Sequence, residues 1–227
     1  MHMRKFLFVV LAFICFTAWS QETETRSPGS FSGVKVAEGI DAYLKKGDKE
    51  SIKVEVSNGS LSDVITEVSG SYLKIHMREN NRSRAHVKVY VTYVQVNKLS
   101  ASSAGSIFSE STIKGNDMEI SASSAGTIEV SLEASSVQVS ASSAGDIELK
   151  GKTGSLTAES SSAGEIDAYE LEAENVEADA SSGASIKLNV TKSLEARASS
   201  GGSIRYRGNP DKSNTGSSSG GSVKKSS

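Results

Sequence analysis

The sequence predicts an all-β fold: a single-stranded parallel β-helix (β-solenoid) of about 19-residue coils, with an N-terminal β region that caps it. Three observations predict this fold. One short phrase, first seen as Ala-Ser-Ser-Ala-Gly-Ser-Ile over 101–107, recurs at a nearly constant step. Apolar residues within each repeat alternate with polar ones, which is the period of a β-strand. The interior positions hold many alanines, and small side chains suit the thin core of a coil.

Residues 1–20 have the layout of a secretory signal peptide. Two basic residues precede an apolar run over 6–16, and small residues at 18 and 20 form a cleavage site before Gln21. The apolar run is shorter than the roughly 20 residues of a transmembrane helix. The single cysteine, Cys15, follows Ile14 and not the small residue of a lipoprotein site. We therefore expect an exported protein, whether periplasmic, at the cell surface or secreted, which keeps neither a membrane segment nor a cysteine after cleavage.

The next segments are expected to be a linker, over 21–29, and an N-terminal β region, over 30–99. The β region lacks the recurring phrase, but turn signals such as Asn58-Gly59 separate five runs with strand alternation. We expect these strands to cover the open edge of the first coil. The runs are Phe31/Val34/Val36, Ile40/Ala42/Leu44, Ile52/Val54/Val56, Leu73/Ile75/Met77 and Val87/Val89/Val91.

Residues 100–208 contain the repeats. Each phrase closes with an apolar residue, at positions 107, 128, 147, 166, 186 and 204, which are 21, 19, 19, 20 and 18 residues apart. Such a unit cannot bury its own apolar face, but it can when it stacks on copies of itself about 4.8 Å away. The Ser-Ser-Ala-Gly segment is expected to form each corner, where glycine supplies a positive φ or lets two backbones approach. Residues 209–227, rich in Ser and Gly, form either a degenerate last coil or a disordered tail.

The sequence resembles a known bacterial family along roughly 30–210. The resemblance rests on Phe31-x-Gly33-Val34-x-Val36, on Gly39-Ile40-Asp41-Ala42-x-Leu44-x-x-Gly47-Asp48, on Val87-x-Val89-Tyr90-Val91-Thr92, on the repeats, and on Tyr206-x-Gly208-Asn209-Pro210. These motifs resemble the "putative auto-transporter adhesin, head GIN domain" family. The resemblance implies a β-helical fold and an exported location, and it implies no catalytic residues. The corners depart from the Ser-Gly-Ala-Ser phrase that is commoner in the family.

Carboxylates are the strongest candidates for chemistry in the repeats. Glu129, Glu148 and Asp167 occupy one slot in consecutive repeats, directly after the closing isoleucine. Such a row suits a cation site or, together with Asp146 and Glu165, the acid and base of a glycosidase. However, the same slot continues with Lys187 and Arg205, so we favour an exposed, solubilising strand face. His76 and His86 have no third ligand of matching type nearby, and we expect no metal, no cofactor and no catalytic residue.

A row of corner serines is the remaining candidate site. Ser142, Ser161 and Ser181 recur at the start of successive corners, where their hydroxyls can bond to the turn backbone, to one another or to a repetitive ligand. The favoured function is a non-enzymatic adhesin or structural binding module whose partner is a glycan, a cell-surface protein or a matrix protein. The alternative is a carbohydrate-binding or polysaccharide-processing β-helix. The formal net charge of −2 predicts no nucleic acid or other polyanion as partner, and the oligomeric state stays open.

Overall fold

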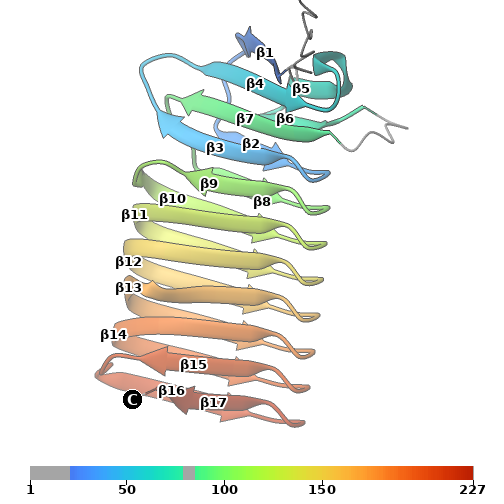
Figure 1. Ribbon diagram of the computed structural model, residues 1–227. Coiled ribbons are helices and arrows are strands. Elements are labelled where there is room, and N and C mark those ends of the chain that lie inside the picture. Colours follow the sequence, from blue (N-terminus) through green and yellow to red (C-terminus); the bar gives the residue numbers. More distant parts are fainter. Residues whose placement is uncertain (1–20, 79–84, 227) are drawn as a thin grey trace, which may run out of the picture.

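The computed structural model describes residues 21–78 and 85–226, and their strands stack into one long solenoid (Figure 1). The expected signal peptide, residues 1–20, lies outside the described residues. The N-terminal region consists of β1 (Gln21–Arg26), β2 (Gly33–Val36), β3 (Asp41–Lys46), β4 (Ser51–Ser57), the 3-10 helix η1 (Leu61–Asp63), β5 (Val64–Ser69), β6 (Tyr72–Met77) and β7 (His86–Tyr93). The repeats form β8 (Lys98–Ala101), β9 (Ser106–Ser109), β10 (Ile113–Ala122), β11 (Thr127–Ala141), β12 (Asp146–Ser160), β13 (Glu165–Ala180), β14 (Ser185–Ala198), β15 (Ser203–Arg207), β16 (Lys212–Ser217) and β17 (Ser222–Lys225).

The coils form two sheets that enclose a thin apolar core. Sheet I contains the strands that follow each corner, namely β3, β7, β9, β15, β17 and the first halves of β11 to β14. Sheet II contains the strands that lead into each corner, namely β2, β6, β8, β16 and the second halves of β10 to β14. Equivalent residues pair in parallel from coil to coil, so that Ile128, Ile147, Ile166, Ile186 and Ile204 form one fully buried column. The predicted parallel β-helix and its inside-outside pattern are confirmed.

The corners lie along one edge of the solenoid (Figure 1). At a representative corner Ser143 and Ala144 both have positive φ, of 50° and 59°, and Gly145 donates its N–H to the carbonyl of Ser142 at 2.9 Å. This is the geometry of a tight turn with two left-handed residues. The Ala144 N–H donates to the Ser162 carbonyl of the next coil at 3.2 Å. The corners are therefore hydrogen-bonded to one another as well as closed individually.

The corner glycine serves close approach. A Cβ built on Gly145 would lie 2.4 Å from the carbonyl oxygen of Ala122 in the preceding coil, and Gly126, Gly164, Gly202 and Gly221 would meet similar contacts. In the first four corners of the repeats the positive φ angles instead fall on the Ser-Ala pair ahead of this glycine, whereas in the last three corners they fall on a Ser-Gly pair that includes Gly183, Gly201 or Gly220. Both roles expected for the corner glycines therefore occur: close approach of two backbones at Gly145 and its equivalents, and positive φ at Gly183, Gly201 and Gly220.

The N-terminal region continues the same solenoid with its coils out of chain order. β2 and β3 form a coil of their own, and this coil lies between the β8/β9 coil and a coil made by β6 and β7. The antiparallel strands β4 and β5 then cover the edges of β7 and β6. All five predicted strand runs are present, as β2, β3, β4, β6 and β7, whereas β5 was not predicted. A further correction concerns 21–29, which was expected to be a linker: its first six residues form β1, paired antiparallel with β4.

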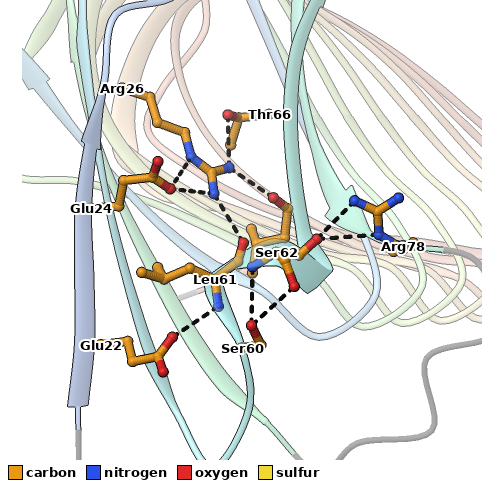
Figure 2. A network of polar contacts seen from close by, with 9 residues as sticks. Glu22, Glu24, Arg26, Ser60, Leu61, Ser62, Thr66 and Arg78 are labelled. Carbon is orange, nitrogen blue, oxygen red and sulfur yellow. Dashed lines mark hydrogen bonds and ion pairs between the residues drawn. The ribbon is translucent and has the colours of Figure 1, made fainter.

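Hydrogen bonds from Arg26 connect β1 to η1 and β5 at the N-terminal end of the solenoid (Figure 2). Its guanidinium donates to the carbonyl oxygens of Val64, at 2.7 Å, and Leu61, at 3.0 Å, and to the hydroxyl of Thr66, at 3.1 Å. Its Nε donates to Glu24 on the same strand at 2.7 Å. Because β1 pairs with β4 on one side and Arg26 reaches η1 and β5 on the other, this strand ties the two antiparallel covers together.

The C-terminal residues form a last coil. β16 pairs with β14 and β17 pairs with β15, both in the register of the earlier coils. The inward positions of β16 are polar: Ser213, Thr215 and Ser217 stack on Leu194, Ala196 and Ala198. Polar side chains at these positions end the apolar core. No helix long and apolar enough to cross a membrane occurs in 21–78 or 85–226.

Candidate ligand-binding surface

Sheet II carries a shallow groove parallel to the axis of the solenoid. Three adjoining hollows of about 490, 500 and 620 Å³ form this groove. In this order they are called the upper, middle and lower hollow, and they run from the N-terminal to the C-terminal side of the repeats. The upper and middle hollows share Ser155 and Thr157, and the middle and lower hollows share Glu195 and Asn214. The groove therefore extends from Lys98 on β8 to the last coil.

Two columns of outward-facing side chains line the groove. They point outward because the strand alternation buries the apolar residue between them, such as Leu156 between Ser155 and Thr157. The parallel register stacks equivalent residues of successive coils. The first column consists of Asp117, Ser136, Ser155, Asn175, Ser193 and Lys212, and the second of Glu119, Gln138, Thr157, Glu177, Glu195 and Asn214.

Hydrogen bonds between coils order the first column. The Ser136 hydroxyl donates to Asp117 Oδ1 at 2.6 Å, and the Ser193 hydroxyl donates to Asn175 Oδ1 at 2.7 Å. The Asn175 amide nitrogen donates to the Gly154 carbonyl at 3.2 Å. Side chains that are already held in place lose less rotamer entropy when a ligand binds, so this column is partly preorganised.

The second column is neutralised at both ends. Lys98 Nζ lies 2.6 Å from Glu119 Oε2, and this hydrogen bond raises the pKa of Lys98. At the lower end Arg197 pairs with Glu195. Between these two ion pairs lie Gln138, Thr157 and Glu177, an amide, a hydroxyl and a carboxylate. The arrangement supplies two groups that both donate and accept hydrogen bonds, followed by one acceptor, at one-coil intervals of about 4.8 Å.

The predicted serine row lies beside this groove. Ser181 lines the lower hollow together with Ser199 and Ser218, whereas Ser142 and Ser161 do not line any of the three hollows. All three predicted serines are half-buried. A ligand role for Ser142, Ser161 and Ser181 stays a prediction. Sequence reasoning missed the groove, although its polar columns recur at the same step as the corner phrase.

The predicted carboxylate row lies on sheet I. Glu129, Glu148 and Asp167 pair in register, and Lys187 continues the column and contacts Asp167 Oδ2 at 2.9 Å. Lys187 Nζ also lies 2.9 Å from Glu165 Oε1, and these two hydrogen bonds raise its pKa. In the adjacent column Asp146 faces Glu165, and partial burial, followed by the charge of Glu165, raises the pKa of Asp146. The positive charge of Lys187 thus partly neutralises the negative charges of Glu165 and Asp167 on this strand face.

An aromatic stack continues the carboxylate column toward the N-terminal region. Tyr43 lies between Tyr90 and Phe108, with ring centroids 5.3 Å apart on both sides. Lys53 Nζ lies 5.4 Å from the centre of the Tyr90 ring. The ring faces are directed at one another, so the stack stabilises the strand surface.

His76 lies near the end of β6, and His86 is the first residue of β7. His76 Nδ1 lies 2.9 Å from the Met77 carbonyl, and His86 is exposed. Within 21–78 and 85–226 the structure groups no three His, Cys, Asp or Glu side chains in a way that could hold a metal ion.

Comparison with known proteins gives a family and a fold. A family model described as "Putative auto-transporter adhesin, head GIN domain" matches residues 30–210. A solved structure described as a "putative adhesin", from Bacteroides fragilis NCTC 9343, is similar with a TM-score of 0.83 and 20% identity, over 91% of this chain and 97% of that chain. Two structures from Parabacteroides distasonis ATCC 8503 each have a TM-score of 0.70. One is described as a "putative lipid binding protein" (20% identity, 91% and 97% covered) and one as a "putative adhesin" (18% identity, 92% and 98% covered). No curated protein sequence matches significantly.

Proposed function

Because the chain belongs to the "putative auto-transporter adhesin, head GIN domain" family, we propose that it is an exported, non-catalytic adhesin that binds an extended polar ligand along the groove of sheet II. The ligand is a glycan or a segment of a cell-surface or matrix protein. The observation that carries the proposal is the pair of polar columns that line three adjoining hollows at one-coil intervals.

The groove suits binding by many weak contacts. Each coil offers a similar set of amide, hydroxyl and carboxylate groups, and a ligand that lies along several coils adds their contributions. A catalytic site has a different architecture, in which a few groups converge on one reacting atom. The similarity to solved structures described as adhesins supports the same reading.

The groove can be tested on a glycan and matrix-protein array probed with residues 21–227. For a bound array component, the single changes Gln138→Ala, Thr157→Ala and Glu177→Ala are expected to weaken binding about two- to threefold each, and the triple change about tenfold or more. The matched control replaces Thr127, Glu129 and Ser131 of sheet I by alanine and should leave binding unchanged. Equal loss in the groove and control variants would contradict the proposal. The same array tests the serine row through Ser142→Ala, Ser161→Ala and Ser181→Ala.

Export is part of the proposal and has its own test. The intact mass of protein recovered from the cell envelope should correspond to a chain that begins at Gln21. Retention of residues 1–20, or a lipid adduct on Cys15, would contradict cleavage by signal peptidase at this site.

A polysaccharide-processing enzyme is the second candidate, because Asp146 has a raised pKa beside Glu165. A carboxylic acid with a raised pKa beside a second carboxylate is the pairing that glycosidases use. The mature chain should be incubated with a panel of polysaccharides and assayed for new reducing ends. Turnover that Asp146→Asn or Glu165→Gln abolishes would replace the binding proposal with this one.

A further inference from the structure

Charge is segregated along the axis of the solenoid. Residues 107–186 contain fifteen acidic and three basic side chains, whereas residues 187–227 contain two acidic and eight basic side chains. The formal net charge of −2 for the whole chain conceals this separation. The last coils are therefore a strongly cationic end on a molecule whose middle is strongly anionic.

The change of sign occurs in one column of sheet I. After Glu129, Glu148 and Asp167, the same outward position is Lys187 on β14, Arg205 on β15 and Lys224 on β17. The cations lie directly above one another at the coil spacing of about 4.8 Å. Like charges that face each other in a sheet destabilise it. This column of cations therefore lowers the stability of the folded protein unless anions bind between them.

The neighbouring column changes in the same coil. Thr127, Asp146 and Glu165 are followed in register by Ser185, Ser203 and Ser222. A row of hydroxyls therefore replaces carboxylates beside the cations. This surface combines ammonium and guanidinium groups, which donate hydrogen bonds and are positively charged, with neutral hydroxyls, which can also donate. Such groups bind the oxygens of carboxylate, sulfate or phosphate.

Apart from Lys152, the cations elsewhere in residues 100–208 have carboxylate partners. Lys114 pairs with Glu133 at 2.8 Å, and Lys192 pairs with Glu174 at 2.7 Å. Lys150 contacts Glu148 at 2.8 Å and Glu170 at 3.5 Å.

The last cations differ in this respect. Arg205 and Lys224 are exposed, and neither is in an ion pair among the described residues. Arg207 donates to the Tyr169 carbonyl and lies over the Tyr169 ring, and Lys225 donates to Asn209 Oδ1 at 2.6 Å. These acceptors are neutral, so the positive charge of all four side chains is available to a partner.

We propose that Arg205, Arg207 and Lys224, which point outward from sheet I, together with Lys225 at the exposed end of the last coil, bind a linear acidic polysaccharide with about one carboxylate or sulfate per sugar. These four residues are here called the basic face. A linear polymer is favoured over a compact anion because the cations are spread over the flat surface of two adjacent coils, Arg205 and Arg207 on β15 and Lys224 and Lys225 on β17, and do not converge on one point. The Ser185/Ser203/Ser222 row supplies hydroxyls for the sugar and its acidic group. This site is independent of the groove, because the basic face is on sheet I and the groove is on sheet II.

The test measures binding of residues 21–227 to polygalacturonate and dextran sulfate, with neutral dextran as the uncharged probe. We expect binding to both acidic polymers at low salt, none to neutral dextran, and a steep loss of affinity as ionic strength rises, since exposed charges are screened. The double variant Arg205→Glu with Lys224→Glu should weaken binding about tenfold or more. The charge-preserving variant Arg205→Lys with Lys224→Arg should keep most of the affinity.

The matched control is Lys114→Glu with Lys152→Glu, which changes the net charge equally but lies in the acidic coils. Equal weakening by this control would show that net charge alone governs binding and would overturn the site. Absence of polymer binding by the wild-type chain, or unchanged binding by the double variant, would overturn it as well. Duplex DNA or anionic lipid vesicles bound more tightly than either polysaccharide would overturn the assignment of the partner. The triple groove variant should retain polygalacturonate binding, so failure of the groove proposal and failure of this one are distinguishable.

Discussion

Single residues show how strictly each position of the coil is specified. The inward position just ahead of each corner is alanine in most coils, at Ala122, Ala141, Ala180 and Ala198, but it is Ser160 inside the stack and Ser217 in the exposed last coil. Ser160 is 3% exposed, and its hydroxyl oxygen has no hydrogen-bond partner in the structure. A buried hydroxyl without a partner loses its bonds to water and gains none in return.

Ser160→Ala is expected to raise the free energy of unfolding by about 1 kcal/mol, because it removes this unsatisfied hydroxyl and introduces the alanine found in the neighbouring coils. Urea denaturation of the wild type and the variant would measure the change. Ser140→Ala, on an exposed position of β11, is the control and should shift stability by less than about 0.5 kcal/mol. A destabilised Ser160→Ala variant would mean that the hydroxyl has a partner in solution.

Asp146 gives a prediction about pH. Its pKa is raised by partial burial and by the neighbouring Glu165, so the folded state disfavours the ionised carboxylate. The resulting destabilisation is absent below the pKa of the unfolded chain, near 3.9, and grows as pH rises through the higher folded pKa. Asp146→Asn should therefore have a higher free energy of unfolding than the wild type at pH 7. The difference should be less than about 1 kcal/mol, because the Asp146 side chain is only partly shielded and remains in contact with solvent, which screens its charge. Thermal melts at pH 7 and pH 3 should show the difference shrinking at the lower pH, and a difference that grows there would contradict this account.

At the scale of elements, the corners hold the coils at a fixed spacing. Each corner has two left-handed residues, a Ser-Ala pair in the first four corners of the repeats and a Ser-Gly pair in the last three. The next residue lies against the backbone of the preceding coil, and it is glycine in every corner except the one that has Ala184. A left-handed conformation costs a residue with a side chain roughly 1 kcal/mol. The hydrogen bonds that link successive corners, such as Ala144 N–H to the Ser162 carbonyl, offset this strain. The corner is thus a property of the stack and not of the local sequence alone.

Gly145→Ala and Ala144→Gly should change stability in opposite directions. The added Cβ of the first variant meets the Ala122 carbonyl, a backbone group that cannot rotate away, and we expect a loss of about 2–4 kcal/mol. The second variant removes the strain of an alanine at φ 59°, and the greater freedom of glycine in the unfolded chain cancels part of the gain, so a change of about 0 to 1 kcal/mol is expected. Denaturant unfolding of both variants is the measurement, and equal destabilisation would argue against a special role for the glycine.

At the scale of the whole molecule, the solenoid is a one-dimensional stack with different ends. The N-terminal end is closed by antiparallel strands that Arg26 ties together, and the C-terminal end by a coil whose inward positions are polar. Between them the core columns pair each coil with its two neighbours. Stability in such a stack is approximately a sum over coils and the interfaces between them.

Deletion of one whole coil, residues 142–160, should leave a folded protein. The deletion joins Ala141 to Ser161 in the same phase of the repeat, so Ile128 would stack on Ile166 and Glu129 on Asp167. We expect the same shape of the far-UV circular dichroism spectrum and a cooperative melt. Deletion of residues 142–150 removes about half a coil and exchanges the two sheets in every later coil, so it should abolish folding. Equal behaviour of the two deletions would show that the coil is not the structural unit.

The sequence by itself determined the repeat, the inward and outward faces of its strands and the family resemblance. These features are readable because side chains alternate along a strand and the coil returns after a nearly constant number of residues, so local pattern and tertiary contact coincide. Only the tertiary structure decided the order of the N-terminal coils, since strands without a repeat carry no mark of which edge they will pair with. The groove and the basic face were also missed, because residues about 19 apart become neighbours only when the coils stack. The net charge of the whole chain hides the separation of acidic and basic segments along the sequence. Stacking of the coils turns this separation into an acidic middle and a basic end of the molecule.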